Sequence, residues 1–110
     1  MSKKNLNEEI YEQFVNNVME VENVKNNNFK SKVKNITKQV KKILSNCSDK
    51  DYVNNNILNS VCNEGFVIKN LINYVKSLEK DEMNNIMVDT MIHNLDISKI
   101  KIDLLEKIAK

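Results

Sequence analysis

A chain of 110 residues, 41% of them apolar, is long enough for one small folded domain with a core and too short for two. It has no proline and a single glycine, Gly65, whereas hairpin turns and phosphate-binding loops depend on glycine, so most β-rich and α/β folds are excluded. The net charge is only +2, but all 17 basic residues are lysine and asparagine is the commonest residue, a bias that indicates an AT-rich source genome rather than a function.

The first expected helix covers residues 7–23, where Asn7 can cap the helix and Glu8 and Glu9 suit the positive end of its dipole. Residues 26–28 then form a connection to the second helix, residues 29–47, which has the clearest pattern in the chain. Its apolar residues follow steps of three and four and therefore share one face. They are Phe29, Val33, Ile36, Val40, Ile43, Leu44 and Cys47.

Lysines occupy the opposite side of residues 29–47. We call Lys30, Lys34, Lys38, Lys41 and Lys42 the lysine row; four of them are spaced four apart, and Lys41 lies beside them. Residues 1–24 are acidic on balance, whereas residues 25–50 hold eight lysines and a single acid. Either the first two helices pack antiparallel with ion pairs along their seam, or the lysine row is open to an acidic partner.

The rest of the chain predicts further short helices. The third begins at a capping box formed by Ser48 and Asp51 and ends at Gly65, which can close a helix in a left-handed conformation. A fourth covers residues 66–79, and a fifth follows Asp81 to about residue 94. The last starts after Asp96 or Ser98 and presents to the core the apolar set Ile97, Ile100, Leu104, Leu105 and Ile108.

The expected fold is therefore all-α: a compact single-domain bundle of five or six short amphipathic helices over residues 1–110, with residues 1–6 as a disordered N-terminus. Connections of two to five residues favour antiparallel neighbours. Residues 100–103 alternate between apolar and charged side chains, which leaves a short strand as the alternative to a helix there.

The residues needed for catalysis or metal binding are scarce. His93 is the single histidine, Cys47 and Cys62 have no CxxC spacing, and a structural zinc site needs four such ligands. We therefore expect no enzymatic activity, no metal and no cofactor. Both cysteines are expected to be buried free thiols, with a Cys47–Cys62 disulfide between neighbouring helices as the alternative.

The chain is expected to be soluble and intracellular, in the cytoplasm or the nucleus. It has no signal peptide, and no apolar run reaches the roughly 18 residues that a membrane span requires.

The expected function is that of a non-enzymatic protein-interaction module: an adaptor, a small complex subunit or an inhibitor. The lysine row is one candidate contact surface, and its partner would be acidic. The other is the row Met83, Met87 and Met91, whose flexible thioethers suit varied partners, including a second copy of the chain bound through residues 83–95.

The alternative is a nucleic-acid-binding protein that sets the lysine row of residues 29–47 on phosphates, with Asn35 or Gln39 near the bases. The chain has no arginine for bidentate base contacts, and no aromatic residue lies among these lysines for stacking. Both features favour the protein-interaction reading.

Overall fold

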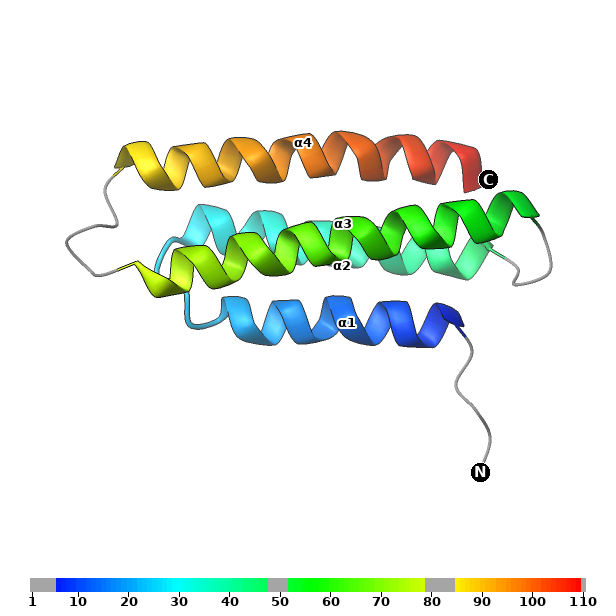
Figure 1. The fold of residues 1–110 in the computed structure, drawn as a ribbon, viewed down its shortest axis with the longest axis horizontal. Helices are drawn as coiled ribbons and strands as arrows, with labels where there is room; N and C mark the ends of the chain where they lie inside the picture. Colours follow the sequence, from blue (N-terminus) through cyan, green and yellow to red (C-terminus); the bar gives the residue numbers. More distant parts are fainter. Residues whose placement is uncertain (1–5, 48–51, 79–84, 110) are drawn as a thin grey trace, which may run out of the picture.

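Four α-helices make up almost all of the chain that the structure describes (Figure 1). The computed structural model describes residues 6–47, 52–78 and 85–109, apart from the side chains of residues 52–54, 85 and 86. The helices are α1 (Leu6–Val21), α2 (Asn27–Asn46), α3 (Tyr52–Ser77) and α4 (Asn85–Ala109). The all-α class is confirmed over these ranges, and residues 100–103 are helical.

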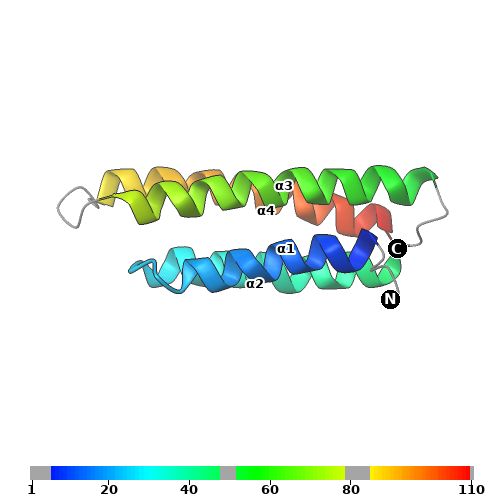
Figure 2. The same cartoon turned by 60° about the horizontal axis from the view of Figure 1, so that its bottom comes forward.

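The helices form two antiparallel hairpins, α1–α2 and α3–α4, which stack as two layers (Figure 2). Across the layers α1 packs on α3 and α2 packs on α4, while α2 and α3 touch only slightly because they occupy diagonal corners. The apolar faces of all four helices meet between the layers. The side chains at the centre of this core include Phe14, Phe29, Ile36, Ile43, Leu58, Ile68, Ile72, Leu95 and Ile102.

The α2 helix forms where its pattern predicts and buries its apolar face. The Oδ1 atom of Asn26 accepts a hydrogen bond of 2.9 Å from the Phe29 amide, which satisfies one of the unpaired donors at the helix start. The helix therefore begins at Asn27, and Asn26 is its cap rather than part of a loose connection.

The expected cap of the first helix, Asn7, has a different role. The α1 helix already begins at Leu6, and the Asn7 amide donates to the carbonyl oxygens of Leu44 at 2.9 Å and Cys47 at 3.4 Å. In an antiparallel hairpin the start of α1 lies beside the end of α2, where the last carbonyls of a helix lack partners. Asn7 thus caps the end of the neighbouring helix. Residues 1–5 lie outside the described residues.

The expected count of five or six helices is wrong, because α3 and α4 are continuous through the two predicted breaks. Gly65 lies inside α3 and has no positive φ angle, so it does not end a helix. Asp96 and Ser98 lie inside α4, where Asp96 pairs with Lys32 and Ser98 is buried. The predicted caps Ser48, Asp51 and Asp81 lie outside the described residues.

Gly65 serves close packing between α1 and α3. A Cβ atom at this position would lie 2.8 Å from Cε2 of Phe14, which is itself buried in the core. The amide of the buried Asn17 donates to the Gly65 carbonyl oxygen at 3.2 Å, at the same crossing. The missing side chain therefore lets α1 approach α3.

Candidate functional site

The outer face of α4 carries a row of exposed aliphatic side chains. Ile97, Ile100, Leu104 and Ile108, which we call the α4 stripe, are 42%, 60%, 54% and 58% exposed. The opposite face of the same helix is buried in the core through Val88, Leu95, Ile102 and Ala109. Of the apolar set expected to face the core, Leu105 packs against it, whereas the four residues of the α4 stripe do not. The reason is that α4 is apolar on two sides and only one of them meets the bundle.

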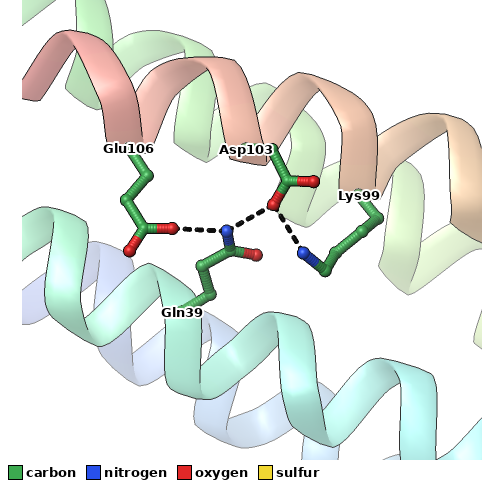
Figure 3. Close-up of polar contacts among 4 residues, drawn as sticks. All are labelled: Gln39, Lys99, Asp103 and Glu106. Carbon is green, nitrogen blue, oxygen red and sulfur yellow. Dashed lines mark hydrogen bonds and ion pairs between the residues drawn. The ribbon is translucent and has the colours of Figure 1, made fainter.

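Polar contacts with α2 fix the rotation of α4 (Figure 3). The Gln39 amide reaches up from α2 and donates at 2.6 Å both to Asp103 Oδ1 and to Glu106 Oε2. Lys99 Nζ lies 2.5 Å from the same Asp103 oxygen. The hydrogen bonds from Gln39 and Lys99 lower the pKa of the Asp103 carboxyl group. These contacts hold one flank of α4 against α2.

An ion pair with α2 and another with α3 complete this arrangement. Lys32 Nζ lies 2.6 Å from Asp96 Oδ1 on the α2 flank, and Lys101 Nζ lies 3.2 Å from Oε1 of the buried Glu64 on the α3 flank. With both flanks of α4 tied to neighbouring helices, the α4 stripe between them points away from the bundle.

The lysine row is divided by the fold. Lys34 turns toward the end of α1, where its Nζ lies 2.5 Å from Oε1 of Glu22, the residue after that helix, and this contact lowers the pKa of the Glu22 carboxyl group. Lys41 also turns toward α1, with its Nζ 5.7 Å from the centre of the Tyr11 ring. The expected charged seam between the first two helices is thus present at Lys34 and Glu22.

Lys38 and Lys42 remain exposed and form no ion pair with a described residue. Together with Asn35 and Lys99 they line a shallow groove of about 310 Å³ between α2 and α4, whose rim also includes Glu106. Lys30 is half-buried. The five lysines therefore do not form one uninterrupted basic surface.

The methionine row lies elsewhere on α4. Met91 packs against the core and Met87 is half-buried, whereas Met83 lies outside the described residues. The large exposed apolar side chains of α4 are further along the chain, between residues 97 and 108.

A groove between α1 and α3 has a volume of about 580 Å³. Amide side chains line much of it, including Gln13, Asn16 and Asn17, and the exposed Met19 and Phe66 are also among its lining residues. It borders the close crossing at Gly65, so its shape follows from the packing of α1 on α3.

The reactive side chains are dispersed. The side chain of His93 is exposed on α4 and has no hydrogen bond or ion pair with a described residue. Cys47 and Cys62 are free and half-buried, so the disulfide alternative is not realised in the structure. Among the described residues no three His, Cys, Asp or Glu side chains gather in a way that could hold a metal ion. Within the same ranges, no helix is long and apolar enough to cross a membrane.

Comparison of the chain with protein-family models, with curated proteins and with solved structures finds no match. The α4 stripe is a row of four exposed aliphatic side chains on one helix, and the packing of the bundle does not use it.

Proposed function

We propose that this chain is a non-enzymatic protein-interaction module, an adaptor, small complex subunit or inhibitor, that binds its partner through the α4 stripe. The observation that supports this most directly is the row of four large aliphatic side chains exposed over three helical turns. Scattered exposed apolar residues are ordinary, whereas the largest contiguous apolar patch on a monomer, usually about 300–600 Å², is often a functional site.

The polar contacts beside the stripe support the same proposal. An interface needs a face whose shape is set before the partner arrives, because ordering it on binding costs affinity. The contacts of Asp103 with Gln39 and of Lys101 with Glu64 hold α4 in one rotation. The stripe is therefore presented on a supported helix and not on a loop.

The test starts with a photoreactive amino acid placed at Ile100 in cells of the source organism, with Lys38 as the comparison site. A protein cross-linked from Ile100 is then purified and its affinity measured with the double variant Ile100→Lys, Leu104→Lys. We expect that variant to bind at least about tenfold more weakly, since it loses two central apolar contacts. Its melting temperature should be unchanged, because both positions are exposed.

The matched control is the double variant Lys38→Glu, Lys42→Glu, which alters exposed residues of α2 and should leave this affinity within about twofold. A partner that is cross-linked only from Lys38, or whose binding tolerates the α4 changes, would contradict the proposal.

Nucleic-acid binding remains the second candidate, on the strength of the exposed Lys38 and Lys42. Lys34 is engaged by Glu22 and Lys32 by Asp96, Lys30 is half-buried and Lys41 turns toward Tyr11, so we expect Lys38 and Lys42 to make the phosphate contacts. The affinity for random duplex DNA should then fall with salt at a slope of about two at most. A slope of four or more that is abolished by the Lys38→Glu, Lys42→Glu variant would favour this candidate over the first.

A further inference from the structure

We propose that the occupant of the α4 stripe is a second copy of the same chain, packed antiparallel about a two-fold axis beside Ile100. This inference rests on the proposed function and names the partner of the same surface. It follows from the spacing of the stripe, from the charges beside it and from its area.

The spacing of the stripe keeps it straight. Ile97, Ile100, Leu104 and Ile108 follow steps of three, four and four, so that 11 residues cover three turns. This period of about 3.67 residues per turn is close to the 3.6 of an undistorted helix. The stripe therefore runs along the axis of α4 and can lie against an equally straight helix over its whole length.

The part of the stripe from Ile97 to Leu104 also matches itself when reversed. If two copies are antiparallel with the axis between residues 100 and 101, Ile97 lies level with Leu104 of the second copy, and each Ile100 lies beside its counterpart. Ile108 then lies level with His93, an exposed residue that has no described partner. A two-fold interface uses one patch twice and requires this self-complementarity.

Charges on one flank of the stripe support the antiparallel pairing. Asp96 and Lys107 are 11 residues apart and so share a side of α4. In the antiparallel dimer this flank meets its own copy, which brings Lys107 to within about two residues, or roughly 3 Å along the axis, of the level of Asp96 in the second copy. Asp96 Oδ1 already lies 2.6 Å from Lys32 Nζ in its own chain, but the Asp96 side chain is about half exposed, so Lys107 of the second copy approaches a carboxylate that it shares with Lys32. The two-fold axis makes this contact twice.

The other flank brings the two Lys101 residues near each other at the axis. Each carries its own counter-charge, since Lys101 Nζ lies 3.2 Å from Glu64 Oε1 within the same chain. The flank is therefore close to neutral, and it does not oppose the association.

The area of the α4 stripe indicates how tightly two copies should bind each other. Four side chains, each about half exposed, form a patch of a few hundred Å², below the roughly 800 Å² that each partner contributes to a standard interface. We therefore expect a weak, reversible dimer with a Kd on the order of 10–100 µM.

Sedimentation of the full chain between 5 and about 500 µM tests the association. We expect the mass to rise from 12.8 kDa toward twice that value. Ile100→Lys should raise the Kd at least about tenfold, because this position meets itself at the axis. Lys107→Glu should raise it about fivefold through the two lost ion pairs. The matched control is Met19→Lys, which makes the same kind of change at an exposed apolar residue of α1 and should leave the Kd unchanged.

Cysteine cross-linking tests the orientation in a background with Cys47 and Cys62 replaced by alanine, after circular dichroism has shown that the background chain folds. A mixture of the Ile97→Cys and Leu104→Cys chains should form the mixed disulfide on mild oxidation, whereas neither chain should link efficiently to itself. Efficient self-linking of Ile97→Cys would indicate parallel helices and overturn the proposal.

A wild-type chain that stays monomeric at 500 µM would also overturn it. The photo-cross-linking experiment then separates the two proposals. A different protein captured from Ile100 by a monomeric chain, and lost in the Ile100→Lys, Leu104→Lys variant, keeps the proposed function and removes this inference. The absence of both dimer and captured protein removes both.

Discussion

At the scale of single residues, the close approach of Gly65 to the Phe14 ring predicts whether an added methyl group raises or lowers the stability of the fold. In an exposed helix, replacing glycine with alanine stabilises by about 1 kcal/mol. Here the added Cβ would lie 2.8 Å from a ring that is closely packed in the core. Overpacking of this kind costs about 1–3 kcal/mol. We therefore expect Gly65→Ala to lower the free energy of unfolding by about 1 kcal/mol in urea denaturation.

The control for this prediction removes the ring. In a Phe14→Leu background the close contact is relieved, so the same Gly65→Ala change should stabilise the chain relative to Phe14→Leu alone. If Gly65→Ala stabilises the wild-type chain as well, the close approach of α1 and α3 at this point is wrong.

At the scale of the helices, Gln39 links α2 to α4 by donating to two carboxylates at once. Gln39→Glu keeps the shape of the side chain but puts a third carboxylate between Asp103 and Glu106. We expect a loss of about 1–2 kcal/mol at pH 7, at the lower end for hydrogen bonds to charged groups because these side chains are partly exposed. Guanidinium denaturation should show this loss shrinking as the pH falls toward 4, when a protonated glutamate can donate again.

Wild-type Asp103 gives the complementary pH dependence. The hydrogen bonds from Gln39 and Lys99 lower its pKa in the folded state, so the stabilisation is complete above the unfolded-state pKa of about 4 and is lost as the pH falls through the lower folded-state value. Asp103→Asn should therefore be less stable than wild type at neutral pH, with a difference that narrows in acid. A constant difference from pH 7 to pH 2 would contradict this role.

The helices also show how far the sequence could predict the structure. The α2 helix was predictable because a single apolar face, a polar opposite face and the Asn26 cap agree with one another. The breaks predicted near Gly65 and Asp96 were wrong because both residues contact other helices. Gly65 leaves room for the Phe14 ring of α1, and Asp96 forms an ion pair with Lys32 of α2. Local signals for a cap cannot be distinguished from such tertiary roles without the partner helix.

The candidate site was missed for a related reason. The residues of the α4 stripe have a clear helical spacing, but so do Leu95, Ile102 and Ala109 on the other side of the helix. Periodicity reports that a face is apolar and not whether the bundle covers it. Likewise, the lysine spacing could not reveal that Lys34 would turn toward Glu22.

At the scale of the whole molecule, the core lies between two hairpins, so neither hairpin can bury its apolar face alone. We expect residues 1–49 and residues 50–110, prepared separately, to show little helix by circular dichroism, since short isolated helices are marginal in water. Mixing them in equal amounts should restore the helical signal and a cooperative thermal transition. A residue 1–49 fragment that is helical and monomeric by itself would contradict this dependence.

The seam where Asn7 holds the carbonyl oxygens of Leu44 and Cys47 gives the molecule a built-in chemical reporter. Burial raises the pKa of the Cys47 thiol, which leaves little thiolate for alkylation at neutral pH while this end of α2 stays closed. In a Cys62→Ala chain, the rate of iodoacetamide labelling therefore follows the local fraying of one helix end, and Asn7→Ala should accelerate it without a matching change in global unfolding. The labelling rate of this one cysteine would report how often a single end of the bundle opens.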